Sequence, residues 1–251
     1  MGNKYLKPFL KSVIIRIDFV SHFRKGNDEL SKELKTELLR FFPILEPRTF
    51  ISGQVEVKRG SSKQMIEEGT NWLFHGIERD KTLSIGTDHF DISYNKYESF
   101  DSLFNDFRPI TVSMYNAYRD LQAIRFGLRY INNIELEGTD VFEWTNYLNK
   151  ALLKIFDIPE DKQTICRAFH NLTMNYGDMI LTFQYGMHNP DFPAPIRKKI
   201  FVLDYDAYYH GLQEMDDVLR NTHEFHDRIE KMFESSISQR LRVIMGVVKN
   251  G

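Results

Sequence analysis

Two arginines near the middle of the chain lie where a strand can present them to an anionic ligand. The segment 124–131 alternates apolar and other residues, which is typical of a strand with one buried face. One face would carry Phe126, Leu128 and Tyr130, and the other Arg125, Gly127, Arg129 and Ile131. Two guanidinium groups on one face can hold an anion bidentately, and Gly127 between them allows a close approach. We therefore take Arg125, Gly127 and Arg129 as candidate ligand-binding residues. The alternative is a structural ion pair with Asp18 or Glu135.

Carboxylates and histidines further along the chain have spacings that a metal ion can use. Asp204 and Asp206 follow a predicted strand and share one face, which can hold a divalent cation; alternatively they end the strand and cap the next helix. His223 and His226 are one helical turn apart and can bind zinc if a third ligand comes from elsewhere. The alternative is a core histidine at 226 and a solvated one at 223. These four residues are weak metal candidates, and we predict no metal and no cofactor.

Tyrosines precede the longest predicted helix. Tyr205 and Tyr208 are further candidate ligand-binding residues, because tyrosine offers a large contact area and a hydroxyl group. They can line a cleft or a dimer interface. The alternative is that they belong to the core.

Familiar catalytic sequence patterns are missing. Cys166 is the one cysteine and has no CxxC partner, so a buried apolar role suits it. No serine lies in a GxSxG elbow, the run 60–63 lacks P-loop spacing, and no dinucleotide fingerprint follows a strand. We expect a protein that is not an enzyme. The alternative is an enzyme whose acid–base groups come together from distant segments.

Hydrophobic periodicity and capping residues predict the elements that position these side chains. Strands are predicted at 12–20, 49–58, 72–78, 82–94, 124–131, 167–174, 179–187 and 199–205. Helices are predicted at 30–41, 100–118, 140–155 and 212–234, with a short one after Ser238. Gly86 can break the strand 82–94, Pro109 should kink or restart the second helix, and Asp140 with Glu143 forms a capping box for the third.

The two halves of the chain repeat one order of elements. A shift of 111 residues lays the strand 13–20 on 124–131 and Leu30 on Val141. The same shift aligns Phe90 with Phe201, Tyr94 with Tyr205 and Tyr97 with Tyr208. We infer an internal duplication into two β-α-β-β-β-α halves, 1–122 and 123–251, the second with a long C-terminal helix. The predicted fold class is α+β, with mainly antiparallel sheets covered by helices and a cleft between the halves.

Composition excludes several classes of protein. The chain has 251 residues, of which 42% are hydrophobic and 27% charged, so it is too apolar to be disordered and does not need disulfides. The formal net charge of −2 argues against nucleic-acid binding, despite basic residues at 4, 7, 11 and 197–199. No signal peptide or membrane-spanning run is expected, which favours a cytoplasmic protein without membrane contact.

Several short blocks carry a resemblance to a known family. They are Ile85-Gly86-Thr87-Asp88-His89-Phe90, Phe126-Gly127-Leu128-Arg129-Tyr130-Ile131-Asn132, Leu203-Asp204-Tyr205-Asp206 and Phe233-Glu234-Ser235-Ser236-Ile237. Over essentially its whole length, the chain resembles a sporadically distributed prokaryotic family of proteins of about 250 residues and unknown function. The resemblance implies horizontally moved genes, such as those of antiviral defence or toxin–antitoxin loci. It implies no activity and no catalytic residue.

These observations together predict a soluble adaptor. We expect a non-enzymatic binding protein that acts through a protein partner or as a homodimer. The alternative is a sensor that binds a small anionic molecule or nucleotide in the cleft between the halves, through Arg125 and Arg129.

Overall fold

In the part of the chain that the structure describes, nine strands form one sheet. The strands are β2 (Leu10–Phe19), β3 (Ile44–Lys58), β4 (Ser61–His75), β5 (Lys81–Ile85), β6 (His89–Tyr94), β7 (Ala123–Glu135), β8 (Ala168–Asn175), β9 (Ile180–Met187) and β10 (Ile200–Gln213). They are hydrogen-bonded in the order β3-β4-β5-β6-β2-β7-β10-β9-β8. β1 (Lys4–Tyr5) and β11 (Val247–Val248) form a separate antiparallel pair. The architecture is α+β and mainly antiparallel, as predicted.

The computed structural model describes residues 4–25, 28–58, 61–118 and 120–248, without the side chains of 4, 52–58, 61–67, 247 and 248. By packing, the chain divides into two compact units. Unit 1 comprises Met1–Val13, Leu128–Tyr209 and Asn221–Gly251, and unit 2 comprises Ile14–Gly127 and His210–Arg220. Strands β2, β7 and β10 each contribute residues to both units. The predicted halves 1–122 and 123–251 are stretches of sequence rather than packing units, so that division stays a prediction.

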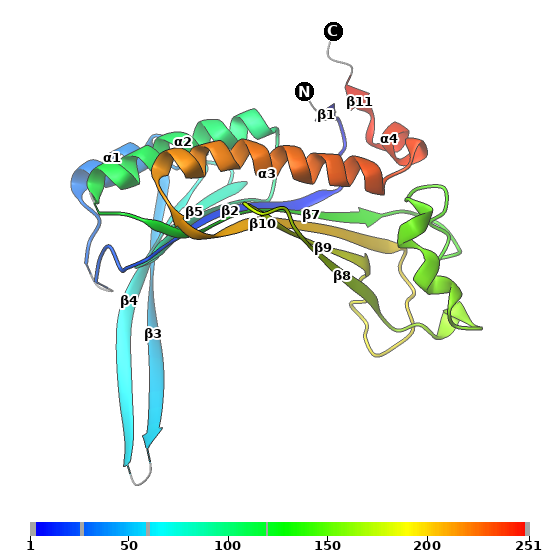
Figure 1. Cartoon of the computed structure of the whole chain (residues 1–251), viewed down its shortest axis with the longest axis horizontal. Coiled ribbons are helices and arrows are strands. Elements are labelled where there is room, and N and C mark those ends of the chain that lie inside the picture. The colour runs from blue at the N-terminus through cyan, green and yellow to red at the C-terminus, as the bar shows by residue number, and fades with distance from the viewer. Residues whose placement is uncertain (1–3, 26–27, 59–60, 119, 249–251) are drawn as a thin grey trace. The chain divides into compact units, whose positions relative to one another are not determined.

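In unit 2, two helices cover one face of the strands (Figure 1). They are α1 (Lys32–Leu39) and α2 (Phe100–Ala117), and their N-termini are capped by the hydroxyl groups of Ser31 and Ser99. Ring contacts connect α2 to the strands, since Phe107 lies 6.2 Å from Phe90 and 6.0 Å from Phe126 between centroids. The helix continues through Pro109 as one element, so the restart expected there does not occur.

A long hairpin extends from unit 2 (Figure 1). Strands β3 and β4 pair antiparallel over fifteen positions, from Ile44 opposite His75 to Lys58 opposite Ser61. The sequence predicted only 49–58 and 72–78 here, because alternation fails in the polar run between them. The break at Gly86, which the sequence analysis anticipated, divides the predicted strand 82–94 into β5 and β6. The described residues of the first half therefore form four strands between the two helices, where three were predicted.

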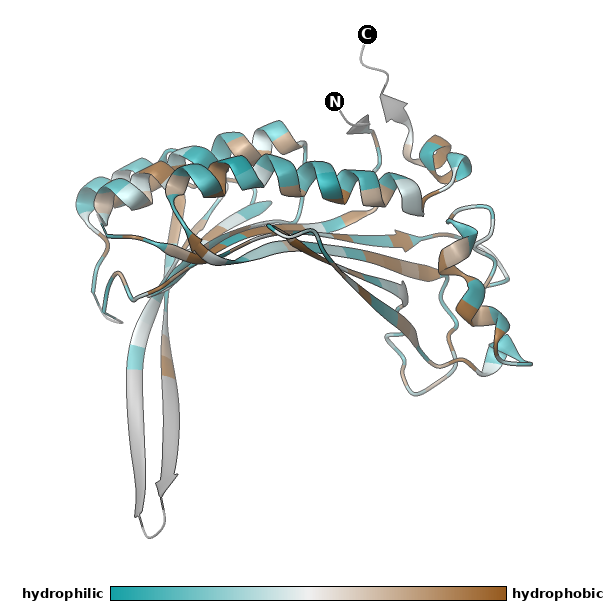
Figure 2. Cartoon of the chain, viewed as in Figure 1, coloured by the Kyte–Doolittle hydropathy of each residue, from teal (hydrophilic) through white to brown (hydrophobic). Residues whose placement is uncertain are grey.

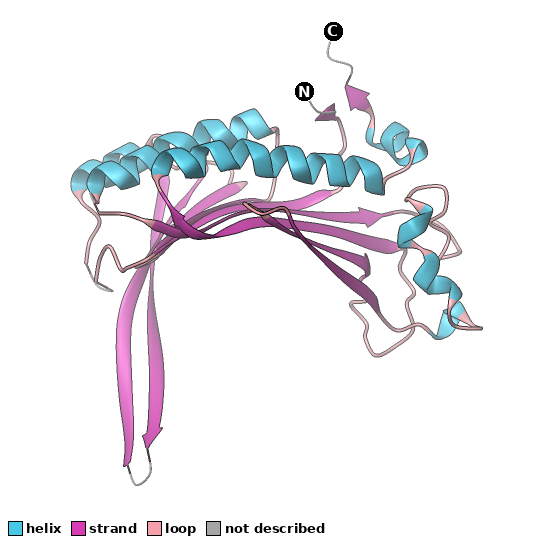
Figure 3. Cartoon of the chain, in the orientation of Figure 1, coloured by secondary structure: helices cyan, strands magenta, loops and turns pink. Residues whose placement is uncertain are grey.

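In unit 1, helix α3 (Met215–Ser236) runs along the strands through its residues from 221 onward, and α4 (Gln239–Met245) follows it (Figure 3). Tyr205 of β10 is fully buried against Phe183 of β9, with parallel rings 4.6 Å apart, and its edge meets Phe233 of α3. Ser238 caps α4 and Gly246 ends it at a positive φ of 70°, as predicted. Figure 2 shows hydrophilic and hydrophobic residues mixed along α3, as in an amphipathic helix.

The predicted helix at 140–155 is wrong. The segment forms turns and two short 3₁₀ helices, η1 (Lys150–Leu152) and η2 (Lys154–Asp157), and a third, η3 (Lys162–Thr164), follows. Trp144 and Phe156 both pack on Phe201, with centroids 5.4 and 6.4 Å away. Asn149 is bonded to the backbone of 235 and 236, which fixes the segment against the end of α3. Burial of these large side chains outweighs the local capping signal, so the second half has no α-helix in the predicted place.

Among the described residues, no helix is both long enough and apolar enough to cross a membrane.

Candidate functional site

The face of unit 1 that the helices leave uncovered carries a bidentate ion pair. On β7, Tyr130 points toward α3, where its hydroxyl lies 3.1 Å from Nδ1 of His226, so its neighbour Arg129 points to the opposite face. There Nε and Nη2 of Arg129 donate to both carboxylate oxygens of Asp204, at 2.8 and 2.6 Å. The Asp204 side chain is only 10% exposed and that of Arg129 is 41% exposed. The hydrogen bond to Asp204 raises the pKa of Arg129, and the charge of Asp206 adds to the effect.

This pairing decides what the two aspartates can do. Asp204 and Asp206 lie in the middle of β10 instead of following its strand, because β10 continues to Gln213. The alternative that they end the strand and cap the next helix is therefore wrong. Both oxygens of Asp204 are already held by Arg129, so a cation would have to displace a charge-assisted pair. The sequence analysis offered Asp18 or Glu135 as the ion-pair partner on this strand. Asp204, with which Arg129 pairs in the structure, was not among them.

In unit 2, the uncovered face carries a chain of linked charges. Arg16 of β2 donates to Asp18 at 2.8 and 2.6 Å and lies 3.9 Å from Asp91 of β6. Arg125 of β7 lies 3.5 Å from the other oxygen of Asp18. Burial raises the pKa of Asp91, although the positive charge of Arg16 opposes the shift. The sequence analysis offered a structural ion pair with Asp18 as the alternative role of the arginines on this strand. The structure shows that pair for Arg125.

A second group of polar residues in unit 2 was missed by the sequence reasoning. Nδ1 of His89 lies 2.8 Å from Asp88, whose other oxygen is 3.7 Å from Nε2 of His22. Gly86 makes room for the ring, since a Cβ there would lie 2.4 Å from the His89 side chain. These contacts hold the pKa of Asp88 below its usual range, against the effect of its own burial. The sequence signal that could have indicated this group is Gly86, three residues before His89, because a glycine there leaves space for the imidazole ring.

The remaining candidate ligand-binding residues, Tyr205, Tyr208 and Gly127, differ in how deeply they are buried. Tyr205 is fully buried, whereas Tyr208 is half-buried on the same strand. Burial raises the pKa of Tyr205 strongly, which keeps its hydroxyl group neutral. Gly127 is buried in β7. Arg125 belongs to unit 2 and Arg129 to unit 1, so each is described only with its own neighbours.

The histidine candidates separate on α3. His226 comes within 4.8 Å of Asp227 and Glu230, counting one ligand atom from each, and His223 is not in that group. Burial and the negative charges of Glu234 and Asp227 raise the pKa of Glu230. All three residues come from one turn of one helix, and Asp227 is exposed.

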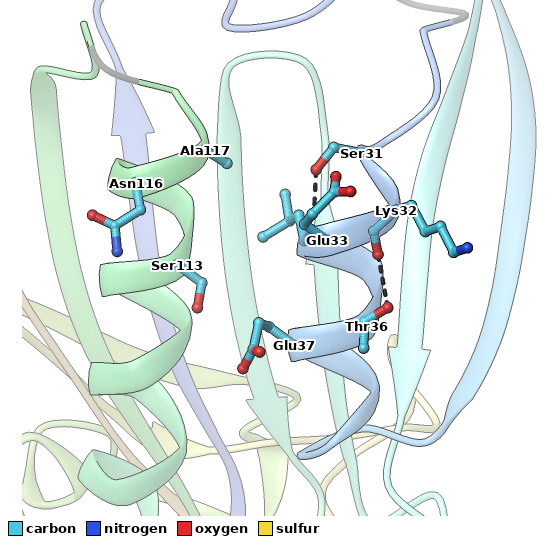
Figure 4. A pocket seen from close by; sticks show the side chains of 9 residues that line it. Ser31, Lys32, Glu33, Thr36, Glu37, Ser113, Asn116 and Ala117 are labelled. Carbon is cyan, nitrogen blue, oxygen red and sulfur yellow. Dashed lines mark hydrogen bonds between the residues drawn. The ribbon is translucent and has the colours of Figure 1, made fainter.

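A shallow groove lies between α1 and α2 in unit 2 (Figure 4). Its lining includes Lys32, Glu33, Glu37, Ser113 and Asn116. The hydroxyl groups of Ser31 and Thr36 are used locally, the first by the backbone N–H of Leu34 and the second by the carbonyl of Lys32. The groove thus combines two carboxylates with the single ammonium group of Lys32, so its charge is on balance negative and does not suit an anionic ligand.

Comparison with known proteins adds no family. No family model matches the chain. No curated protein matches it either. The resemblance to the sporadically distributed prokaryotic family therefore stays a prediction.

Proposed function

We propose that this protein is a non-enzymatic adaptor that binds a protein partner through the helix-free face of its sheet, in a mobile defence or toxin–antitoxin context. The observation that carries the proposal is the bidentate pair of Arg129 with Asp204. An arginine held in this way is neutralised and fixed in direction, and it still exposes 41% of its side chain.

Such pre-paired charges suit recognition of a protein surface better than capture of a free anion. A small anion would have to displace Asp204 from Arg129 and leave a carboxylate that is nine-tenths buried without its partner, which is costly. A protein surface can add hydrogen bonds at the exposed side of the pair without breaking it, and charge patterns of this kind mainly give specificity. The charges of Arg16, Asp18 and Asp91 in unit 2 are likewise already paired with one another.

We also propose that the fold arose by internal duplication. From the centre of the sheet outward, the first half contributes β2, β6, β5, β4 and β3, and the second contributes β7, β10, β9 and β8. In each half the first strand in sequence lies innermost, and the others follow in reverse order. This repeated order is the support for the proposal, in addition to the 111-residue self-similarity of the sequence.

Co-purification tests the adaptor function. The tagged chain is co-expressed with the product of the adjacent gene, as wild type, as the double variant Arg129→Ala/Asp204→Ala, and as Arg220→Ala. The double variant removes the pair without leaving a buried charge, and Arg220 is an exposed α3 residue that pairs with Asp217, one turn away on the same helix. We expect wild type and Arg220→Ala to retain the partner and the double variant to lose at least nine-tenths of it. Equal retention by all three, with folding confirmed by circular dichroism, would refute the use of this face.

Thermal melts separate the sensor alternative from the adaptor. Inorganic phosphate and a nucleoside triphosphate are the probes, because both carry the oxygens that paired arginines recognise. The adaptor predicts no ligand-dependent rise in Tm. A rise that Arg129→Ala abolishes, in a variant that still folds, would favour the sensor.

A further inference from the structure

The sheet has two edge strands, and they differ in how they are protected. Strand β3 carries Glu46, Pro47 and Arg48 in its first residues, and Glu46 is paired with Arg79. Charged residues and proline are the usual means by which an edge strand avoids pairing with another chain. Strand β8 reads Ala-Phe-His-Asn-Leu-Thr-Met-Asn and contains no charged residue, no proline and no glycine. Its edge therefore lacks the protection that β3 has.

Strand β8 also exposes one large apolar side chain on each of its faces. It pairs with β9 over all eight positions and, among the described residues, has no strand on its other side, since it ends the sheet. Phe169 is 44% exposed and Leu172 is 47% exposed. Their positions differ by three, so they point to opposite faces of the strand. An added strand would cover apolar side chains on both faces and would also pair the outer backbone groups.

The order of the sheet leaves a place for that strand. Counted outward from the centre, β8 is the fourth strand on its side, as β4 is on the other side. β4 has an antiparallel neighbour beyond it, β3, whereas β8 has none among the described residues. On the duplication proposed above, the place that β3 fills on one side of the sheet is open beyond β8 on the other.

We propose that β8 pairs antiparallel with β8 of a second copy of this chain and forms a symmetric homodimer. Pairing about a twofold axis is antiparallel by geometry, and it is self-complementary, so it closes at two copies. An uncharged strand can face itself without like-charge repulsion, which any strand with lysine or glutamate along its edge would suffer. Pairing of β8 with β3 of another copy is disfavoured by Pro47, which has no N–H, and would continue head to tail into a polymer.

Matched threonine variants test the interface. Thr173 of β8 and Thr49 of β3 are both exposed edge-strand residues, so Thr173→Lys and Thr49→Lys make the same chemical change at the two edges. Sedimentation velocity at protein concentrations from about 1 to 100 µM should show wild type and Thr49→Lys as dimers, with a dissociation constant inside or below this range. Thr173→Lys should dissociate at least tenfold more readily. A wild-type monomer at the highest concentration, a dimer broken by Thr49→Lys alone, or a polymer would overturn the proposal.

A cysteine scan provides a test that does not depend on the lysine variant. The single native thiol is removed by Cys166→Ser, and one cysteine is then introduced in turn at positions 170 to 173, or at Thr49 as control. A residue next to the twofold axis lies opposite itself, at a distance that a disulfide can span. We expect oxidation to cross-link at least one β8 variant into dimers and not Thr49→Cys. If no β8 position forms a cross-linked dimer, the β8 pairing is wrong, whatever the sedimentation result.

Discussion

The Arg24 side chain shows at residue scale how backbone carbonyl groups can surround a buried charge. It is almost fully buried in unit 2, and its guanidinium donates to backbone carbonyls from three segments: Gly86 at 2.9 Å, Ile85 at 3.4 Å, Lys25 at 3.2 Å, Asp28 at 3.3 Å, and Thr70. Burial lowers the pKa of Arg24, and the nearby negative charge of Asp28 opposes this shift only in part. The side chain therefore fastens the loop after β2 to strands β4 and β5.

Replacement of Arg24 by lysine should destabilise the protein clearly. One ammonium group cannot reach the carbonyls that five N–H donors reach, so Arg24→Lys leaves buried acceptors unpaired and should cost about 2–3 kcal/mol of unfolding free energy. Urea unfolding measures the loss. The control is Arg220→Lys at an exposed pair, for which we expect a change within about 0.5 kcal/mol. Equal effects of the two variants would mean that the Arg24 contacts contribute little.

At element scale, the attachment of β8 to β9 depends on a glycine. Gly186 lies opposite Phe169 with φ at 150°, and a Cβ there would come within 1.9 Å of the carbonyl oxygen of Ala168. Gly186→Ala should therefore cost about 2 kcal/mol or more and speed amide exchange along 168–175. Gly177, in the turn between the same strands, has positive φ but open space around it. Gly177→Ala should cost only backbone strain, about 1 kcal/mol, and leave exchange in β8 unchanged. Amide hydrogen exchange measured on both variants makes the comparison. If the amides of β8 exchange as slowly in Gly186→Ala as in wild type, the attachment of β8 does not depend on this glycine.

The same scale shows which elements a sequence can predict. Helices α2 and α4 were found because Ser99 and Ser238 cap them locally and their apolar spacing agrees with the cap. The helix at 140–155 was not formed, because burial of Trp144 against Phe201, a contact 57 residues apart along the chain (201 minus 144), outweighs the capping box. Alternation likewise placed Arg129 correctly on one face of β7. Its partner Asp204 could not be predicted, since the strand order that makes β7 and β10 neighbours is not local information.

At the scale of the whole molecule, the long hairpin separates into a part that supports the core and a part that extends from it (Figure 1). Near the body, β4 contributes Trp72 and Phe74 to the core of unit 2, and Lys35 of α1 lies 4.5 Å from the Trp72 ring. Farther out, Ile51 stands opposite Glu68 and is 69% exposed, so burial has already fallen there. Backbone pairing continues the ribbon outward to Lys58 and Ser61, and a two-stranded ribbon adds little stability in water.

Shortening of the hairpin tests this division. Deletion of residues 52–67, with a two-residue Asn-Gly turn joining Ile51 to Glu68, keeps the register of the remaining pairs. We expect Tm to change by no more than about 3 °C, corresponding to less than about 1 kcal/mol for a chain of this size. The control deletes 48–71 and joins Pro47 to Trp72 with the same turn, which disturbs the packing of Trp72 and should lower Tm by at least twice that amount. Melts followed by circular dichroism make the comparison. If the shorter deletion unfolds the protein as the longer one does, the outer ribbon must contribute to the core.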